Sequence, residues 1–200
     1  MNRNTLAALM GLALIAAPAA NAEGLSYTYL EGRLVHTQLD VLETSAVTAN
    51  GNGAGIAGSF AFGETGLFVA GSYDTVDTDE ADISLDRTSL GLGYAMPLGE
   101  TLHLVFDAKA LRLKGTVEGF SESENGYQAT LGVRSMLADN VEGSIKAGVI
   151  KVENDDLTFY DGGIVELGAR WNMDGMWSVG IDTSLTKDER SASIGLRAQW

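Results

Sequence analysis

The sequence predicts an all-β protein, an antiparallel up-and-down transmembrane β-barrel of ten strands. Three observations carry this prediction: apolar side chains recur with a two-residue period, connections alternate between long and short, and a terminal aromatic residue follows an amino-terminal export signal. The 25 glycines and 2 prolines suit twisted strands and tight turns. No apolar run after the amino-terminal segment is long enough to form a membrane-spanning helix.

The amino terminus has the three parts of a secretory signal peptide. Arg3 lies in a short polar start, an apolar stretch runs from about Leu6 to Ala17, and Ala20-Asn21-Ala22 forms a small-residue cleavage site. This apolar stretch is shorter than the ~20 residues that a bilayer-spanning helix needs. We therefore expect residues 1–22 to be a cleavable signal peptide and residues 23–200 to form one outer-membrane β-barrel domain.

The charge balance restricts the partners. The chain has 13 Lys plus Arg, and subtracting Arg3 leaves 12 against 27 Asp plus Glu, a net charge of about −15. Nucleic acid is not an expected partner, because phosphate contacts need a basic face. Cysteine is absent, which excludes disulfides and Cys-based metal sites. The expected surroundings are outer-membrane lipid and lipopolysaccharide.

The two-residue period places the strands. They are expected near residues 25–37, 54–62, 66–76, 84–96, 101–113, 125–137, 141–152, 163–172, 176–186 and 191–200. An eight-stranded barrel is the alternative, which applies if the short second segment or the final hairpin is assigned wrongly.

The predicted connections alternate in length. The odd ones are long and acidic, apart from a shorter last one: Gln38–Gly53, Asp77–Ile83, Lys114–Glu124, Glu153–Gly162 and Lys187–Arg190. The even ones are tight: Gly63–Thr65, Pro97–Glu100, Ala138–Asn140 and Asn172–Gly175. Transmembrane barrels have short periplasmic turns and longer external loops, and an even strand number puts both termini on the periplasmic side.

One face of the predicted strands is apolar and is expected to contact lipid. Aromatic residues cluster at its two ends, where amphipathic rings favour the headgroup level. Those at the end with the short turns are Phe62, Tyr94, Trp171, Trp177 and Trp200, and those toward the long loops are Tyr73 and Tyr127.

The opposite face is charged and nearly neutral overall. Its predicted lumen charge network comprises Glu31, Arg33, Arg87, Asp107, Lys109, Arg134, Lys146, Glu166, Arg170, Asp182 and Arg197, with Asp74 and Glu142 on the same face. Barrels of about eight strands are filled by side chains, whereas clear aqueous channels appear at about sixteen. The pattern therefore favours a structural or surface-interaction role with a filled lumen, because buried charges need partners of opposite sign. The alternative is a porin-like narrow channel for small solutes.

The last nine residues, Ala192 to Trp200, have apolar side chains at every second position back from the terminal aromatic ring. This strand resembles the last strand of outer-membrane barrel proteins of Gram-negative bacteria. The resemblance implies an insertion signature of Ile194, Leu196 and Trp200 that the barrel assembly machinery recognises. It also implies that the exported chain resides in the outer membrane of a Gram-negative bacterium.

The predicted mature start, Glu23–Gly32, resembles the opening of a family of small outer-membrane barrels regulated by diffusible signal factor. Arg33 and Leu34 depart from the glycine and aromatic residue expected to follow in that family.

No catalytic or cofactor motif accompanies these features. The chain has two histidines, His36 and His103, and neither lies in a Gly-x-Ser-x-Gly elbow or a metal-spaced His pair. A general base that exchanges protons near neutral pH is therefore hard to assign. We expect no enzyme activity, no cofactor and no metal site.

Two acidic clusters lie in predicted external connections: Asp77, Asp79, Glu80 and Asp82, and Glu153, Asp155, Asp156 and Asp161. Neither matches a defined Ca²⁺ loop. We hypothesise that they share divalent cations with lipopolysaccharide, or that they repel anionic ligands and favour cationic ones.

Overall fold

The computed structural model describes residues 25–40, 48–78, 83–117, 120–153 and 158–200. The predicted signal peptide, residues 1–22, lies outside the described residues. The strands are β1 (Tyr29–Asp40), β2 (Thr48–Ala61), β3 (Leu67–Thr78), β4 (Ile83–Pro97), β5 (Leu102–Val117), β6 (Phe120–Ala138), β7 (Val141–Glu153), β8 (Thr158–Asn172), β9 (Trp177–Leu185) and β10 (Glu189–Gln199). The 3-10 helix η1 (Gly63–Thr65) is the only helix among the described residues. In this part of the chain, no helix is long and apolar enough to cross a membrane.

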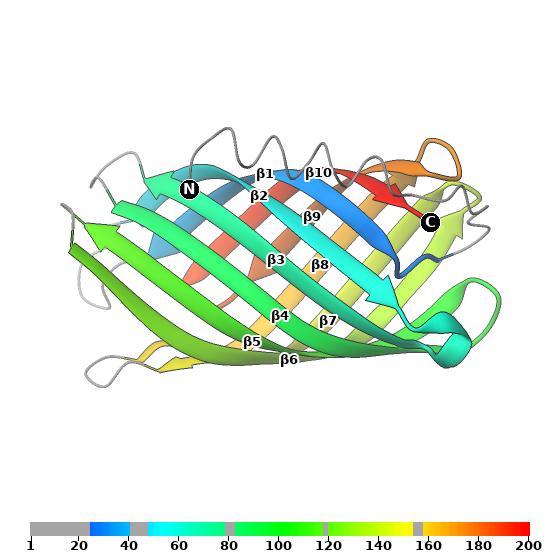
Figure 1. Cartoon of the computed structure of the whole chain (residues 1–200), viewed down its shortest axis with the longest axis horizontal. Helices are drawn as coiled ribbons and strands as arrows, with labels where there is room; N and C mark the ends of the chain where they lie inside the picture. Colours follow the sequence, from blue (N-terminus) through cyan, green and yellow to red (C-terminus); the bar gives the residue numbers. More distant parts are fainter. Residues whose placement is uncertain (1–24, 41–47, 79–82, 118–119, 154–157) are drawn as a thin grey trace.

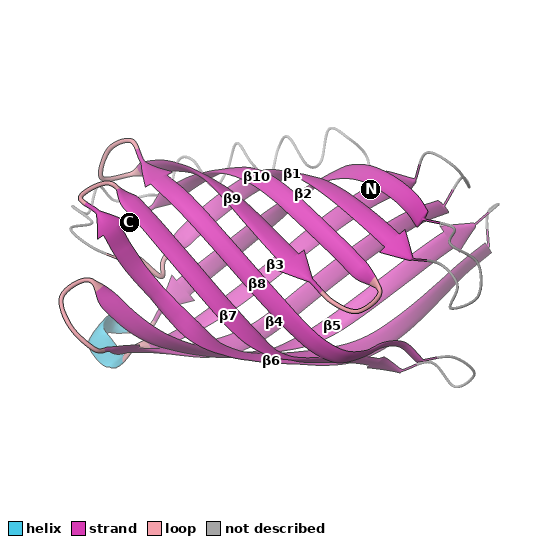
Figure 2. Cartoon of the chain, turned by 180° about the vertical axis from the view of Figure 1, so that it is seen from behind, coloured by secondary structure: helices cyan, strands magenta, loops and turns pink. Residues whose placement is uncertain are grey.

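Each strand pairs antiparallel with the next one, and β10 pairs with β1 to close the barrel (Figures 1 and 2). At the seam, Leu34 of β1 lies opposite Ile194 of β10 and Ala54 of β2. The predicted ten-stranded up-and-down barrel is confirmed. The eight-stranded alternative is wrong, because β2 pairs along its length with both β1 and β3, and β9 and β10 form a paired hairpin.

The predicted difference in connection length is wrong in its detail. β1 continues to Asp40 and β2 begins at Thr48, so most of the predicted loop Gln38–Gly53 lies in strands. The same holds for Lys114–Glu124, because β5 ends at Val117 and β6 begins at Phe120. The strands extend far beyond the apolar belt. In β2 the extension has a composition typical of turns, and in β5 the apolar residues change from the outward to the inward face. For these reasons the sequence did not predict that the strands continue there.

The tight turns are short, as predicted, and lie at the barrel end that carries the carboxyl terminus (Figure 2). In the first of them, Gly66 has a φ of 77°, and a Cβ there would lie 2.4 Å from the carbonyl oxygen of Ala95. Only glycine fits this turn without strain.

The outward face of the strands is a belt of exposed apolar side chains. Its largest members include Leu34, Phe60, Leu90, Leu92, Phe106, Leu131, Ile145, Ile181, Ile194 and Leu196. Phe62, Tyr94 and Trp171 are exposed at the end with the tight turns, and Tyr127 is exposed toward the other end. An apolar band of this extent is suited to lipid and not to water.

We predict that Leu92→Arg destabilises the barrel by about 2–4 kcal/mol, the cost of a basic side chain near the bilayer midplane. Leu92 is outward and exposed, between Leu90 and Tyr94 on β4. The measurement is urea unfolding in lipid vesicles, followed by heat-modifiable migration on gels. Ser123→Arg is the control, because Ser123 is exposed on β6 beyond the belt, and its cost is about 0–1 kcal/mol. Equal costs for the two variants would contradict a lipid-facing β4.

Candidate functional site

The polarity of the strands reverses along their length, and β5 shows this most clearly. In its periplasmic part, Phe106 is outward and exposed while Lys109 faces the lumen. Beyond Ala110, the lumen-facing residues become Leu111 and Leu113, and the outward Arg112 is exposed. A strand of 16 residues exceeds the roughly 9–11 that cross a bilayer. The outer part of β5 therefore lies beyond the hydrocarbon.

Other strands reverse at a corresponding level. In the outer part of the barrel, the inward apolar residues include Val35, Leu39, Ala49, Val76, Leu85, Leu113, Ile150, Val152 and Ile164. Outward positions there are polar and include His36, Asn52, Asp77, Asp86, Arg112 and Lys151. The inner face of the outer part is therefore largely apolar, with the Arg87–Glu189 ion pair at the level of Leu39, whereas its outward face is polar.

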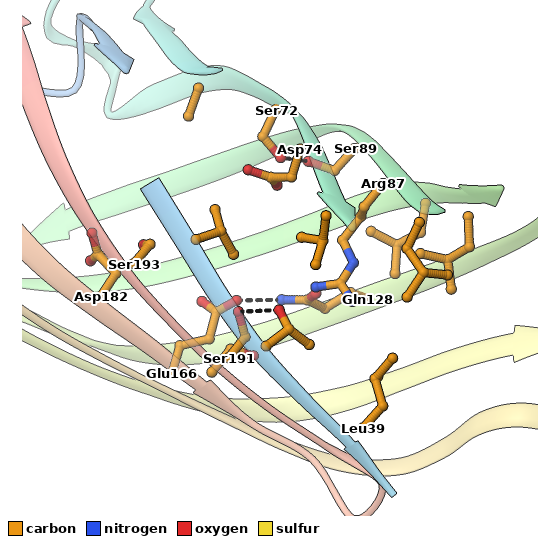
Figure 3. A pocket seen from close by; sticks show the side chains of 18 of the residues that line it. Leu39, Ser72, Asp74, Arg87, Ser89, Gln128, Glu166, Asp182, Ser191 and Ser193 are labelled. Atoms are coloured by element: carbon orange, nitrogen blue, oxygen red, sulfur yellow. Dashed lines mark hydrogen bonds between the residues drawn. The ribbon is translucent and has the colours of Figure 1, made fainter. Parts of the chain in front are cut away.

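A cavity of about 1670 Å³ occupies the lumen from the outer mouth inward, and on β1 to β3 its lining reaches Tyr29, Ala57 and Ala70. Phe120 and Glu122 line its mouth, whereas Arg33, Lys146 and Asp182 line its floor. Figure 3 shows polar side chains from several strands pointing into this space. We call this cavity the outer cup.

Two lysines and two carboxylates form the middle of the floor. The Lys146 Nζ atom lies 2.5 Å from Glu166 Oε2 and 3.0 Å from Asp107 Oδ2. The Lys109 Nζ atom lies 3.2 Å from Asp107 Oδ1, and Gln128 donates to Glu166 Oε1 at 2.7 Å (Figure 3). The two positive and two negative charges balance, which reduces the cost of burying them.

A bidentate ion pair crosses β2 beside this group. Arg33 of β1 donates from Nε and Nη2 to Asp74 of β3, at 2.7 and 2.6 Å. Gly55 of β2 lies between them, and a Cβ there would be 2.0 Å from Asp74 Oδ1. Only glycine leaves the wall flat enough for the two side chains to meet over the intervening strand.

A second pair links strands that are not neighbours. Arg87 Nη2 of β4 donates to both carboxylate oxygens of Glu189 of β10, at 2.7 and 2.5 Å. Sequence reasoning missed Glu189, because it lay in the predicted connection Lys187–Arg190. Its two-residue spacing from Ser191 and Ser193, which also face the lumen, is a signal that could have identified it.

Glu31 is the centre of the deeper layer, with only 2% of its surface exposed. Its Oε2 atom lies 2.8 Å from Arg197 Nε and 2.9 Å from Arg170 Nη2. Arg170 also lies 3.2 Å from Asp182 Oδ2. One carboxylate thus holds two guanidinium groups together near the seam of the barrel.

Tyr27 closes the periplasmic end. Its ring stacks on Phe68 and His103, with centroids 5.1 and 5.7 Å away, and the Arg134 guanidinium lies 4.5 Å from its centroid. The Tyr27 hydroxyl lies 3.1 Å from His103 Nδ1. Burial raises the pKa of the Tyr27 hydroxyl above its usual value. At the periplasmic end, the lumen is therefore filled by three stacked rings and the guanidinium group of Arg134.

The segment that carries Tyr27 is held by several bonds. Residues 25–28 precede β1, although the sequence predicted a strand from residue 25. Ser26 Oγ donates to the Trp200 carbonyl oxygen at 3.0 Å, and Arg134 Nη1 donates to the Ser26 carbonyl oxygen at 2.7 Å. Arg134 also forms a bidentate pair with Glu142, at 2.6 and 2.8 Å. Tyr27 was not predicted as a site residue, because it continues the two-residue period of β1 and so has the sequence pattern of an ordinary strand residue.

The two histidines lie in different environments. His103 is inside the lumen against Tyr27. His36 is outward and exposed, and its Nδ1 atom lies 2.9 Å from Asn52 Oδ1. Neither of these two contacts is a His–Ser or His–Asp pair.

The acidic clusters are mostly outside the described residues. Asp77 accepts a hydrogen bond from Ser84 Oγ at 2.5 Å. Asp79, Glu80, Asp82, Asp155 and Asp156 lie outside the described residues, and the side chains of Glu153 and Asp161 are not described either. Within the described ranges, no three potential ligands gather in a way that could hold a metal ion.

A closed antiparallel barrel with an apolar outer belt, aromatic rings at both ends of it and a charged lumen defines an integral β-barrel of the Gram-negative outer membrane. The chain belongs to the family of the outer membrane protein beta-barrel domain, whose model matches residues 5–172. No curated protein matches the chain.

Solved structures share the fold at low sequence identity. The NanC porin is 10% identical with a TM-score of 0.52, covering 86% of this chain and 100% of that one. An outer membrane channel from Pseudomonas putida F1 is 10% identical with a TM-score of 0.50, covering 92% and 100%. Neisserial surface protein A (NspA) is 16% identical with a TM-score of 0.43, covering 89% and 100%. These identities show the fold alone.

We predict that Glu31→Gln destabilises the barrel by about 3–5 kcal/mol, because it leaves Arg170 and Arg197 without their shared buried carboxylate. Urea unfolding in lipid vesicles measures this change. Glu122→Gln is the control, since Glu122 is exposed at the mouth of the cup, and its effect is within about 0.5 kcal/mol. A neutral effect of Glu31→Gln would show that the deep ion pairs are not needed for the fold.

Proposed function

We propose that this outer-membrane β-barrel has a structural or surface-interaction role in the cell envelope and that its lumen is closed to solutes. The observation that carries the proposal is the series of ion pairs across the periplasmic half of the lumen. Glu31 joins β1 to β8 and β10, while Lys146 of β7 joins β5 and β8. Such pairs both fill the lumen and cross-link the wall.

Three successive layers support closure. The lysine and carboxylate group lies at the floor of the outer cup, the Glu31 group lies below it, and Tyr27 lies at the periplasmic end. A solute would have to separate buried partners, and breaking one buried pair costs about 3–5 kcal/mol. The charges of the predicted lumen network are therefore proposed to hold the barrel together and not to mark a solute path.

A narrow porin-like channel is the second candidate. The outer cup already takes the lumen from the mouth to the level of Lys109 and Lys146. Between that level and the periplasm, side chains and the segment around Tyr27 form the described part of the barrier. Movement of these groups would open a path without unfolding a strand.

Single-channel recording in planar bilayers separates the two candidates. We expect the wild-type barrel to give no reproducible conductance steps, because its floor is closed. A variant with Tyr27→Ala, Glu31→Ser, Arg170→Ser, Lys146→Ser and Glu166→Ser removes side chains from all three layers at constant net charge and is expected to give steps. Tyr127→Ala changes an outward ring and serves as the silent control. Reproducible steps from the wild type would support the channel instead.

Lipopolysaccharide is the proposed partner of the outward surface just beyond the belt. Basic side chains occupy outward positions at this level, among them Arg112, Lys114, Lys151 and Arg190. They are suited to the anionic groups of lipopolysaccharide. The likeness of Glu23–Gly32 to barrels regulated by diffusible signal factor stays a prediction.

The carboxyl-terminal strand is proposed to be the part that the barrel assembly machinery recognises. Ile194 and Leu196 are outward and each about half exposed. Trp200 is held by its main chain, since its N–H donates to the Thr28 carbonyl oxygen at 3.1 Å and its own carbonyl accepts from Ser26. The indole is thus not required for these hydrogen bonds.

We expect Trp200→Ala to lower the folded fraction in cell outer membranes several-fold, while refolding of the purified chain from urea stays close to wild type. Heat-modifiable migration measures the folded fraction in both cases. Trp177→Ala is the control, because Trp177 belongs to the same predicted aromatic belt but is not terminal. Normal assembly of Trp200→Ala in cells, or an equal loss in both variants, would contradict the recognition role.

A further inference from the structure

We propose that the outer cup binds one uncharged amphiphile, with an alkyl chain along the apolar wall and a head group that bears hydroxyls near the floor. The inference rests on the proposed function, because a cup closed at its floor retains a ligand instead of passing it through. It deepens that proposal by naming the chemical class that the surface-exposed cavity would take.

The apolar wall is the first argument. Strands β1 to β5 line the outer part of the cup with the side chains of Val35, Leu39, Ala49, Val76, Leu85, Leu111, Leu113 and Val117. The barrel has no hydrocarbon outside it at this level, since the outward neighbours are polar. Val35, Ala49, Val76 and Leu111 are buried among their neighbours and make the wall apolar, whereas Leu39, Leu85, Leu113 and Val117 keep part of their surface open. The open apolar surface gains free energy when an apolar ligand covers it.

Hydroxyl groups form the second argument. Ser72 and Ser89 lie 2.8 Å apart across β3 and β4, and Ser191 and Ser193 of β10 line the cavity on another side (Figure 3). Ser184 of β9 also lines the cavity. In the register of the seam, Ser193 lies opposite Val35 and Ser191 lies opposite Thr37, so hydroxyls adjoin the apolar wall. They offer both donors and acceptors to a neutral hydroxyl-bearing head group.

The pairing of the floor charges argues that the ligand is uncharged. Lys109 and Lys146 contact Asp107 and Glu166, and Arg33 holds Asp74 in a bidentate pair. A charged head group would have to separate one of these pairs or remain without a partner, and either is costly in a desolvated site.

The mouth adds selectivity against anions. Glu122, Glu124 and Asp188 line it, together with Lys187. The whole chain carries a net charge of −14. A negative field at the entrance lowers the local concentration of anionic amphiphiles such as fatty acids.

The size of the cavity is compatible with this ligand. Sites for small molecules occupy roughly 300–1,000 Å³, and the outer cup measures about 1670 Å³. The cup therefore has room for an alkyl chain, its head group and some water.

The test is calorimetric titration of the full barrel in detergent-free lipid nanodiscs with octane-1,2-diol, using protein-free discs as the blank. We expect one saturable site per barrel. Octanoate, which has the same chain length and a negative charge, is expected to bind at least about ten-fold more weakly, because a charged head group has no unpaired partner at the floor. Octylammonium tests the cationic case and is also expected to bind more weakly than the diol.

Matched variants locate the site. Val76→Asn places an amide in the apolar wall and is expected to weaken diol binding about ten-fold or more. Thr75→Asn, on the outward face beside it, is expected to bind as the wild type does. Ala49→Trp fills the wall of the cup and serves as a second test if Val76→Asn fails to fold, which heat-modifiable migration reports.

Three results would overturn the proposal: a titration equal to that of protein-free discs, diol and octanoate binding equally well, or unchanged binding in a folded Val76→Asn or Ala49→Trp variant. Conductance steps without loss of diol binding would overturn closure alone. The two failures are therefore distinguishable.

Discussion

A lipid bilayer offers no water to the peptide groups of a strand, so a sheet that crosses it must close on itself. In this protein the pairing of β1 with β10 provides the closure, from Tyr29 opposite Gln199 to Leu39 opposite Glu189. The same register places Glu31 opposite Arg197 on the inner side of the seam. Closure of the backbone and neutralisation of the buried charges thus depend on one strand pairing.

The thickness of the hydrocarbon is the second constraint on the strands. Within it, apolar side chains face outward and charged ones pair inside the lumen. Beyond it, water surrounds the wall, and β5 shows the result in the change from Lys109 to Leu111 and Leu113 on its inner face. One continuous strand therefore builds two structures, a cross-linked membrane barrel and an external cup with an apolar lining.

The membrane-embedded part could be predicted from the sequence because one local rule governs it. Alternation at every second residue predicted all ten strands. The outward positions of Phe62, Tyr94, Trp171 and Tyr127 followed from the same rule. Closure into ten strands followed from the count of segments.

Other features depend on contacts between distant residues, and local patterns do not report them. Tyr27 closes the lumen because Phe68, His103 and Arg134 surround it from three other strands. Glu189 pairs with Arg87 from a position that resembled a loop. The sequence did not predict the outer cup, because apolar side chains of β5 face outward up to Ala110 and inward from Leu111. This change interrupts the alternation close to residue 113, where the strand was expected to end.

The most direct test of this account uses the absence of cysteine from the chain, which makes any introduced thiol unique. Single variants along β5 would be labelled in intact cells with a membrane-impermeant maleimide. The account predicts labelling of Leu113→Cys inside the cup and of Lys114→Cys on the outer wall, but not of Val105→Cys below the floor or Phe106→Cys in the lipid belt. Labelling of Val105→Cys from outside, or protection of Leu113→Cys, would contradict an outer cup closed at its floor.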